Sequence, residues 1–276
     1  MSNRLKLTED LEAADSLRFL AQALELISVV KMQQIRRSVL KTRDFLDRLA
    51  DVFVDVKGNL QVVSFSTLTK NNKSAAVLIS ANTRLYGNIV YQVFEEFNKF
   101  LKENKKADAV VVGKIGKELF ETESRHEYSY FEVPDNEVTF VALEPLIAKI
   151  LNYQKVTVFY GRFINVLNQI PQTREITGEQ PFEGQPEQDR KLHFLFEPGL
   201  ENILNFFETQ IFTSDFKQTI NETQLARYAS RINAMEEALI NIDSRIKNIR
   251  YLKLRAIKDT QNKKQQQTIA GIGLWG

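Results

Sequence analysis

The sequence predicts an α/β protein in which a long antiparallel two-helix coiled coil, made by the N- and C-terminal helices, joins a central Rossmann-like α/β domain. All six prolines lie between Pro134 and Pro198, so both ends of the chain are free of helix breakers. Both ends also carry apolar residues at alternating steps of three and four, the spacing of a coiled-coil seam. We expect three segments, 1–56, 57–215 and 216–276.

The C-terminal seam is the more regular of the two, with no turn signal from position 225 to 249. A lone helix would leave this stripe in water, at a cost of about 0.8 kcal/mol per exposed methylene. The stripe therefore predicts a partner helix of comparable length, although the long core helix of an ordinary domain is an alternative. The seam consists of Leu225, Tyr228, Ile232, Met235, Leu239, Ile242, Ile246 and Ile249.

The N-terminal helix, expected over about 8–54, is the simplest partner. In the middle of its seam, over 27–39, the step becomes four, four, four, which predicts a stutter that locally relaxes the supercoil. The domain between the two helices can return the chain to where it left, so we expect them to pair antiparallel. The seam is expected at Leu17, Leu20, Leu24 and Ile27, then at Lys31, Ile35 and Val39, and then at Thr42, Leu46, Leu49 and Phe53.

Between these helices the chain alternates between strand-like and helix-like stretches. Apolar runs at 75–80 and 107–112 predict two buried strands, and helical spacing over 85–103 predicts a helix between them. Strand, helix and strand in this order predict a right-handed parallel crossover, the unit of a doubly wound sheet. Further elements are expected as a possible strand at 123–133, a helix at 137–152, a strand at 155–160, a polar loop at 176–191, a strand at 192–196 and a helix from Gly199 onward.

Composition and charge argue against several classes of function. Lys and Arg number 37 against 35 Asp and Glu, so no global field draws the chain to nucleic acid or to an anionic membrane. With no cysteine, the chain can form neither disulfides nor thiolate zinc sites. His126 and His193 stand far apart, and His193 lies in an apolar run typical of a satisfied structural histidine. No metal, secretory signal or membrane-spanning segment is predicted.

The glycine-containing turn Gly113–Lys117 follows a predicted strand but fails as a phosphate loop. Such a loop needs four residues between its glycines and a Ser or Thr after the Lys. Here the glycines are three apart and Glu118 follows Lys117. Neither a dinucleotide fingerprint nor a nucleophile elbow occurs elsewhere. We predict no catalytic or cofactor-binding residue, and the residues favour an interaction protein over an enzyme.

The last helix is locally basic. Between Arg245 and Lys264, Asp259 is the only acid among many Lys and Arg residues. Such a stretch suits an acidic protein groove, RNA or plain solvation, of which solvation is the default. A coiled-coil adaptor or RNA-binding scaffold that uses this helix therefore stays open as an alternative.

Short motifs spread over nearly the whole chain occur in the order in which one family carries them. The segment 23–32 is similar to Ala-Met-x-Met-Val-Ser-x-x-Lys-Leu, and 229–235 is similar to Ala-x-Arg-Met-x-Ala-Met. Between them lie Val110–Gly116, Phe163-Ile164-Asn165, Gln169-Ile170-Pro171 and Phe196-Glu197-Pro198. In these motifs the chain resembles the gamma subunit of F-type ATP synthases, the central rotor shaft.

The resemblance implies a shaft whose tip enters a ring of alternating alpha and beta subunits, and a foot on the membrane c-ring beside an epsilon-like subunit. It implies a peripheral location on the cytoplasmic side of an energy-transducing membrane, with no membrane insertion, no nucleic acid partner and no cofactor. Nucleotide chemistry would occur on the neighbours, coupled to proton or sodium transport. The implied contacts with beta subunits are Leu24, Arg250, Lys253, Arg255 and Thr260.

Two positions depart from the family pattern. The family's Asp-Arg-Gly-Leu-Cys-Gly turn corresponds to Asn82–Gly87, where Arg84 replaces a glycine, so the turn is expected to differ in backbone or strain. Near the C-terminus Ala256 replaces a glutamine, which affects the segment implied to touch the beta subunits. These departures leave open a gamma-like subunit of a specialised ATPase with another task.

Overall fold

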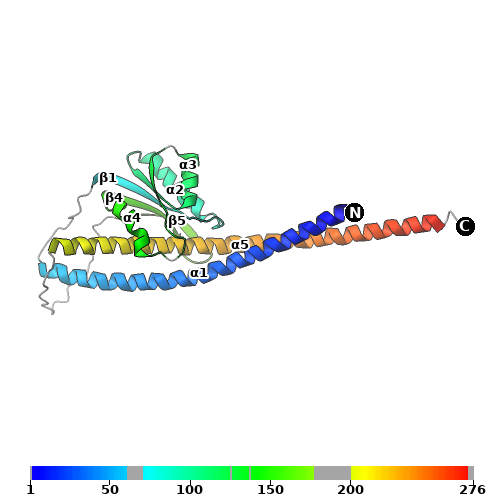
Figure 1. Ribbon diagram of the computed structural model, residues 1–276, viewed down its shortest axis with the longest axis horizontal. Helices are drawn as coiled ribbons and strands as arrows, with labels where there is room; N and C mark the ends of the chain where they lie inside the picture. The colour runs from blue at the N-terminus through cyan, green and yellow to red at the C-terminus, as the bar shows by residue number, and fades with distance from the viewer. Residues whose placement is uncertain (1, 61–70, 125, 137, 177–199, 273–276) are drawn as a thin grey trace. The chain divides into compact units, whose positions relative to one another are not determined.

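The computed structural model describes residues 2–60, 71–124, 126–136, 138–176 and 200–272. Its two long helices are α1 (Ser2–Leu60) and α5 (Leu200–Ile272), shown in Figure 1. By contacts the chain divides into one unit made of Met1–Ile27 with Ile232–Gly276 and a second unit made of Ser28–Arg231. This division cuts across the three predicted segments, which stay a prediction.

The second unit is built on a five-stranded sheet in the order β3-β2-β1-β4-β5. The strands β1, β2, β3 and β4 are parallel, and β5 runs antiparallel to β4 at one edge. This mixed α/β arrangement confirms the predicted fold class of the central domain. The strands are β1 (Asn71–Ile79), β2 (Asp108–Val112), β3 (Tyr128–Phe131), β4 (Tyr153–Phe163) and β5 (Gln169–Ile176).

Helices cover both faces of this sheet because the strands bury alternate residues on opposite sides. On one face, Val77 of β1 packs in a core with Leu146 of α4 (Phe140–Ile150) and Phe216 of α5. On the other face, Phe97 of α2 (Ile89–Glu103) meets Phe159 of β4 edge-on, with ring centroids 5.5 Å apart. The N-terminal part of α5 is therefore part of the core of the second unit.

Most elements of the second unit lie where the sequence predicts them, with two differences. The turn at 113–117 opens a helix, α3 (Lys114–Glu123), because Gly113 at φ 99° ends β2 and redirects the chain. The strand β5 was not predicted, because Pro171 within it lowers its strand propensity; an edge position tolerates that proline. The predicted strand 192–196 and the polar loop beyond Ile176 lie outside the described residues.

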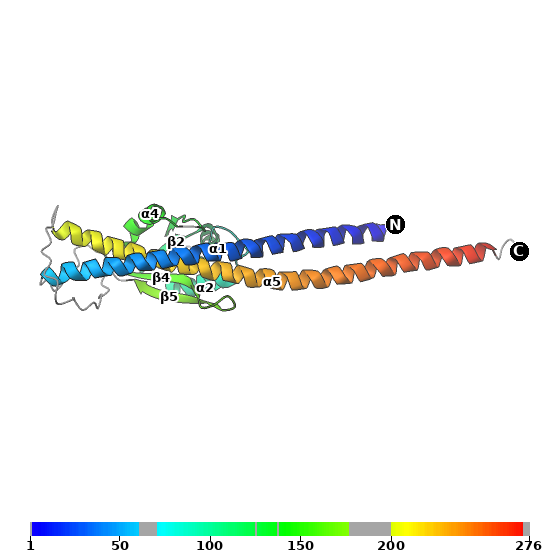
Figure 2. The same cartoon turned by 90° about the horizontal axis from the view of Figure 1, so that it is seen from below.

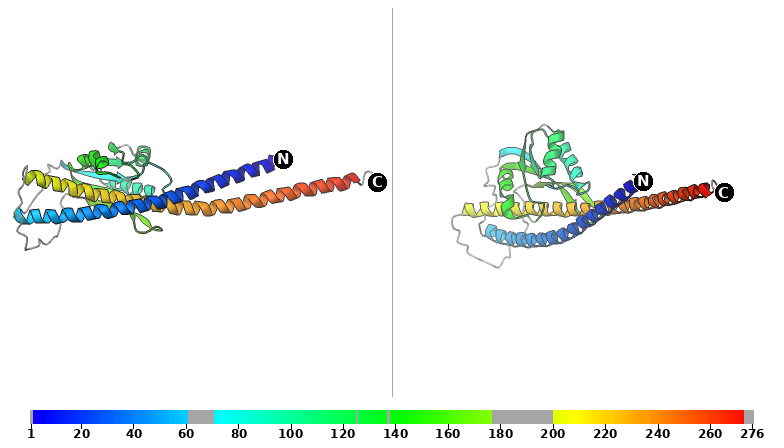
Figure 3. Two further views of the ribbon diagram at one scale, coloured as in Figure 1. Left: turned by 60° about the horizontal axis from the view of Figure 1, so that its bottom comes forward. Right: turned by 45° about the vertical axis from the view of Figure 1, so that its right-hand side comes forward.

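The first unit consists of the start of α1 and the end of α5, which pack antiparallel. Ala14 of α1 lies in a buried cluster with Ile246 and Ile249 of α5. Four residues further along α1, Arg18 Nε lies 2.8 Å from Asp243 Oδ1. The contacting residues of α5 therefore decrease in residue number as those of α1 increase, which is the mark of an antiparallel pair. Figures 2 and 3 show these blue and orange segments running side by side. The predicted antiparallel pairing is confirmed here.

The first part of the seam predicted for α1 is wrong, whereas its later members Ile35 and Thr42 are buried. Leu17, Leu20 and Ile27 are 56%, 54% and 49% exposed. In this first part the small residues Ala14, Ala21 and Ser28 are buried instead. Their spacing of seven residues continues through Ile35 to Thr42 without the predicted stutter. Alanine and serine let a neighbouring backbone approach closely, which an apolar-residue count overlooks. The buried positions include Ala14, Ala21, Ser28, Met32, Ile35 and Thr42.

The predicted seam of α5 does face inward. Each of its eight positions is buried or half-buried in the unit to which it belongs. The buried members are Leu225, Tyr228, Met235, Ile246 and Ile249, and the half-buried ones are Ile232, Leu239 and Ile242.

Candidate functional site

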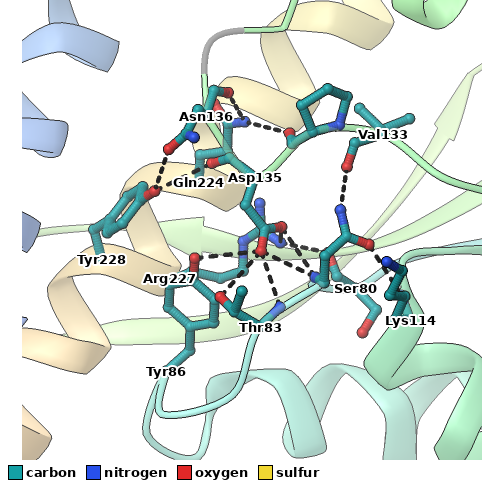
Figure 4. Close-up of polar contacts among 12 residues, drawn as sticks. Ser80, Thr83, Tyr86, Lys114, Val133, Asp135, Asn136, Gln224, Arg227 and Tyr228 are labelled. Carbon is teal, nitrogen blue, oxygen red and sulfur yellow. Dashed lines mark hydrogen bonds and ion pairs between the residues drawn. The ribbon is translucent and has the colours of Figure 1, made fainter.

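Helix α5 is fixed to the sheet at a buried ion pair. Arg227 Nη1 of α5 lies 2.9 Å from Oδ1 of Asp135, which follows β3, and the side chains are 4% and 11% exposed. The same Nη1 donates a hydrogen bond of 2.6 Å to the carbonyl oxygen of Ser80, at the carboxyl end of β1. Figure 4 shows the pair among its neighbours. We call Asp135, Arg227, Tyr228, Arg231 and the turn 82–87 the α5 junction.

Asp135 gathers most of the donors of the α5 junction. Its carboxylate accepts hydrogen bonds from the backbone N–H of Asn82, at 3.0 and 3.1 Å, and of Thr83, at 3.0 Å. The Thr83 hydroxyl, at 3.2 Å, and the Tyr86 hydroxyl, at 3.5 Å, complete the set. A buried carboxylate tolerates loss of water when a cation and several donors replace its solvation. The turn is thereby tied to the same atoms that hold α5.

Arg231 holds the turn from its other side. Its guanidinium carbon lies 3.7 Å from the centroid of the Tyr86 ring. Its Nε donates to the Leu85 carbonyl at 3.0 Å, and its Nη2 donates to the Arg84 carbonyl at 2.9 Å. The planar fork of an arginine can stack and donate at the same time, which a lysine ammonium cannot do.

Tyr228 and Gln224 secure the segment that follows β3. The Tyr228 hydroxyl donates to the Asp135 carbonyl at 3.2 Å, and Gln224 Nε2 donates to the Asn136 carbonyl at 2.5 Å. Tyr228 also meets Tyr86 edge-on, with ring centroids 5.6 Å apart. Burial raises the pKa of the Tyr228 phenol far above its usual value, so it stays a hydrogen-bond donor at every physiological pH.

The turn itself comes very close to α5. Gly87 has φ 62°, and a Cβ placed there would lie 2.4 Å from Ser230 Oγ and 2.9 Å from the Ser230 carbonyl oxygen. Leu85, with φ 71°, is the non-glycine residue with positive φ among the described residues. The strain expected from the loss of a glycine at Arg84 therefore lies one residue later. Arg84 instead turns its exposed side chain to Glu118, with Nη2 2.7 Å from Oε2.

The α5 junction holds α5 to the sheet and has no features of a metal-binding or catalytic site among the described residues. Among the residues that the structure describes, no group of three or more His, Asp or Glu side chains could hold a metal ion. Every oxygen of Asp135 is already used by donors of the protein itself. The arrangement can resist rotation and sliding of α5 against the sheet, because several buried bonds must break together.

The residues implied as beta-subunit contacts lie elsewhere, in the first unit. Arg250, Arg255 and Thr260 are exposed on α5, and Lys253 on α5 and Leu24 on α1 are half-buried. The Thr260 hydroxyl donates to the Ala256 carbonyl of its own helix at 2.7 Å. Their part in contacts with other subunits stays a prediction.

Sequence reasoning missed the ion pair of the α5 junction. Arg231 lies in a recognised motif, but Arg227 and Asp135 do not. A signal was present, because Arg227 and Arg231 are four residues apart on one face of a helix beside apolar seam positions. Two arginines on such a face indicate a buried acid nearby, although the sequence does not say which one.

The chain is similar to known proteins over almost its whole length. It matches the model of a family described as ATP synthase over residues 5–268. The ATP synthase gamma chain of Roseiflexus sp. (strain RS-1) is 25% identical over 264 residues, covering 87% of each chain. That of Staphylococcus carnosus (strain TM300) is 24% identical over 258 residues, covering 88% of this chain and 89% of the relative.

Solved structures share the fold. A chain of the Euglena gracilis mitochondrial ATP synthase, in a structure of its OSCP, F1 and c-ring, matches with a TM-score of 0.70 at 16% identity, covering 98% of this chain and 94% of that one. A chain of the rotor of the same enzyme matches with a TM-score of 0.65 at 16% identity, covering 94% and 99%. In the part of this chain that the structure describes, no helix is long and apolar enough to cross a membrane.

Proposed function

We propose that this chain, which belongs to the ATP synthase family, is the gamma subunit of an F-type ATP synthase and acts as its central-stalk rotor. The observation that carries the proposal is the antiparallel pairing of the two chain ends, with Ala14 packed against Ile246 and Ile249. Curated relatives named as gamma chains align with 87% or more of this chain in the two cases described above.

As a rotor, the chain would transmit torque along α5. This helix runs without a break from Leu200 to Ile272 and belongs to both units. The α5 junction fastens it to the sheet through Arg227 and Arg231. In the first unit, the packed seam and the Arg18–Asp243 ion pair oppose slipping of α1 against α5. A coiled coil turns as one body when its seam resists slipping.

The partners follow from the family. The helix pair would turn inside a ring of alpha and beta subunits, and the α/β domain would stand on the membrane c-ring beside an epsilon-like subunit. Exposed Arg250 and Arg255, with half-buried Lys253, would meet acidic loops of the beta subunits during rotation. The chain is a non-catalytic subunit, and the nucleotide chemistry belongs to its neighbours.

Two finer features of the proposal depend on the rest of the complex. We propose that the ring moves protons or sodium ions, and that this chain lies on the cytoplasmic side of an energy-transducing membrane as a peripheral subunit. The outer face of the helix pair is mixed: Arg250 and Arg255 are exposed, and so are the apolar side chains of Tyr251 and Leu254, at 64% and 60%.

Affinity purification of the tagged full-length chain from native membranes tests the proposed function. We expect alpha and beta subunits to co-purify in amounts comparable to the tagged chain, together with c-ring subunits. Recovery of ribosomal or other RNA cargo without alpha and beta subunits would overturn the proposal in favour of a scaffold. An untagged strain processed in parallel controls for proteins that adhere to the resin.

A further inference from the structure

A cavity of about 680 Å³ opens within the second unit, between α1, the start of α4 and α5. Its size is that of a small-molecule site, since such sites enclose roughly 300–1,000 Å³. None of its residues belongs to the Gly113–Lys117 turn or to the ion pair of the α5 junction. The lining residues that matter here are Lys31, Arg37, Lys41, Phe45, Phe140, Lys217, Asn221 and Gln224.

The described residues that line the cavity carry positive charge and include no carboxylate. Lys31, Arg37 and Lys41 come from α1, and Lys217 comes from α5, where its Nζ lies 4.2 Å from the centroid of the Phe140 ring. Lys31, Arg37 and Lys41 form no ion pair with the described part of the chain. The like charges of Lys31, Arg37 and Lys41 around one cavity repel each other, and a bound anion would offset that repulsion.

Two buried side-chain amides at the cavity each have one atom without a hydrogen-bond partner among the described residues. Asn221 is 1% exposed and its Nδ2 donates to no described atom, while Gln224 is 0% exposed and its Oε1 accepts from none. The Gln224 amide is fixed in this orientation, because its Nε2 donates to the Asn136 and Pro134 carbonyls. An unpaired buried polar group costs about 1–3 kcal/mol, so such groups indicate a ligand that supplies the missing partners.

The cavity also has an apolar wall. The rings of Phe45 and Phe140 lie 6.1 Å apart between centroids and are tilted by 58°. Both are partly exposed, at 42% and 38%, and both line the cavity. Partly exposed aromatic rings beside basic groups accommodate the uncharged part of an organic anion.

We propose that this cavity binds a small phosphate-bearing anion, of the pyrophosphate or nucleotide class. Lysine and arginine side chains from two helices would bind the phosphate oxygens, and the free Asn221 amide N–H would donate to one of them. The Gln224 carbonyl oxygen would accept from a hydroxyl of the ligand. The cavity belongs to the second unit alone, so the proposal does not depend on the chain acting as a rotor.

Isothermal titration calorimetry of the purified full-length chain tests this site. Pyrophosphate, ATP and AMP serve as probes at 50 and 300 mM NaCl. We expect measurable binding of pyrophosphate or ATP that weakens at the higher salt, because ion pairs with phosphate are screened. The double variant Lys41→Gln and Lys217→Gln should weaken binding by at least about tenfold, because it removes two charge-assisted contacts. The single variant Lys114→Gln, on α3, should bind as the unchanged chain does.

The two sources of phosphate are told apart by the probes. If pyrophosphate and ATP bind with equal affinity, the site recognises phosphate groups alone. If ATP binds at least tenfold more tightly than pyrophosphate, the site takes a nucleotide whose base or sugar contacts Phe45 and Phe140. Both results support the site. Absence of heat with all three probes at millimolar concentration, or full binding by the double variant, would overturn it.

A second variant keeps the proposal testable if the double variant fails to fold. Asn221→Leu removes an unpaired buried donor, so the melting temperature of the ligand-free chain should hold or rise while affinity for the probe falls severalfold. A purely structural role for Asn221 predicts instead a lower melting temperature with unchanged affinity. That result would contradict the proposed contact.

Discussion

Arg227 Nη1 lies 2.9 Å from Asp135 Oδ1, and the same nitrogen lies 2.6 Å from the Ser80 carbonyl oxygen. One guanidinium therefore connects α5, the end of β1 and the segment after β3. Removal of either partner would leave a buried charge without compensation. The strength of this connection decides how firmly the long helix is held to the sheet.

Replacement of Arg227 by Gln should lower the free energy of unfolding by about 3–5 kcal/mol, because it strands the buried Asp135 carboxylate. Urea unfolding followed by circular dichroism measures the change. The matched control is Lys155→Gln, which breaks an ion pair of 2.8 Å whose side chains are 52% and 48% exposed. Exposed pairs contribute about 0–1 kcal/mol. Equal losses for the two variants would contradict the assigned role of Arg227.

The seam of the first unit can be tested at α5. Replacing Ile242 and Ile246 by Asp should separate the helix pair and abolish assembly of the ATPase, because it places two carboxylates in the cluster around Ala14. Native gel electrophoresis with an ATPase stain measures assembly. A complex of this double variant that assembles normally and remains coupled would contradict the assignment of the helix pair as the shaft.

The face of α1 can be tested by a matched pair of variants. Ala14→Asp should lower the melting temperature of the isolated chain, because Ala14 is buried against Ile246 and Ile249. Leu17→Asp should change it by less than about 2 °C, since an exposed substitution typically changes stability by no more than about 0.5 kcal/mol. The opposite order would restore the seam predicted from the sequence.

The turn beside α5 stores backbone strain at Leu85, whose side chain is exposed. Leu85→Gly should therefore stabilise the chain by up to about 1 kcal/mol, because glycine adopts positive φ without steric cost. Gly87→Ala should destabilise it, since the new methyl group would meet the Ser230 backbone. Thermal unfolding of both variants compares the two effects, and a stabilised Gly87→Ala variant would contradict the close approach.

Asp215 of α5 gives a prediction about pH. Burial raises the pKa of its carboxyl group, and Arg174, whose Nη2 lies 3.0 Å from Oδ1, only partly opposes that shift. The folded state thus binds the proton of Asp215 more tightly than the unfolded state does. The stability that this protonation contributes is fully present below the pKa of the unfolded state, and it is lost as the pH rises through the pKa of the folded state. Between these two pKa values, Asp215→Asn should reduce the decrease of the free energy of unfolding with rising pH. Arg174→Gln should steepen it, and urea titrations at several pH values measure both.

The basic side chains of α5 give a prediction about coupling. The triple variant Arg250→Gln, Lys253→Gln and Arg255→Gln should assemble, because surface charges contribute about 0–1 kcal/mol to folding. Ion pumping per ATP hydrolysed should fall at least twofold if these residues meet acidic loops of the beta subunits. The ratio of ion pumping to ATP hydrolysis is measured in inverted membrane vesicles with a fluorescent probe of the ion gradient. The control changes the exposed Lys102, Lys105 and Lys106 to Gln, and equal losses would contradict the assigned contacts.

The central sheet could be predicted from local pattern, because its buried strands are short apolar runs. Strands β1, β2 and β4 were predicted from the apolar runs at 75–80, 107–112 and 155–160. The edge strand β5 could not be predicted, because only its last residue, Ile176, is buried and Pro171 lowers its strand propensity. The cavity proposed to bind a phosphate-bearing anion has no sequence motif, because its residues come from α1, α4 and α5, which are far apart in sequence.

The sequence by itself determined two helical chain ends, an antiparallel pairing and the family to which their motifs belong. Periodicity and proline placement act locally, so they can be read along the chain. Only the tertiary structure decided which face of the first part of α1 is buried and that Arg227 pairs with Asp135. Packing selects Ala14 and Ala21 over the larger Leu17 and Leu20 because close approach of two backbones needs small side chains. An ion pair between residues 92 positions apart depends on how the whole chain folds.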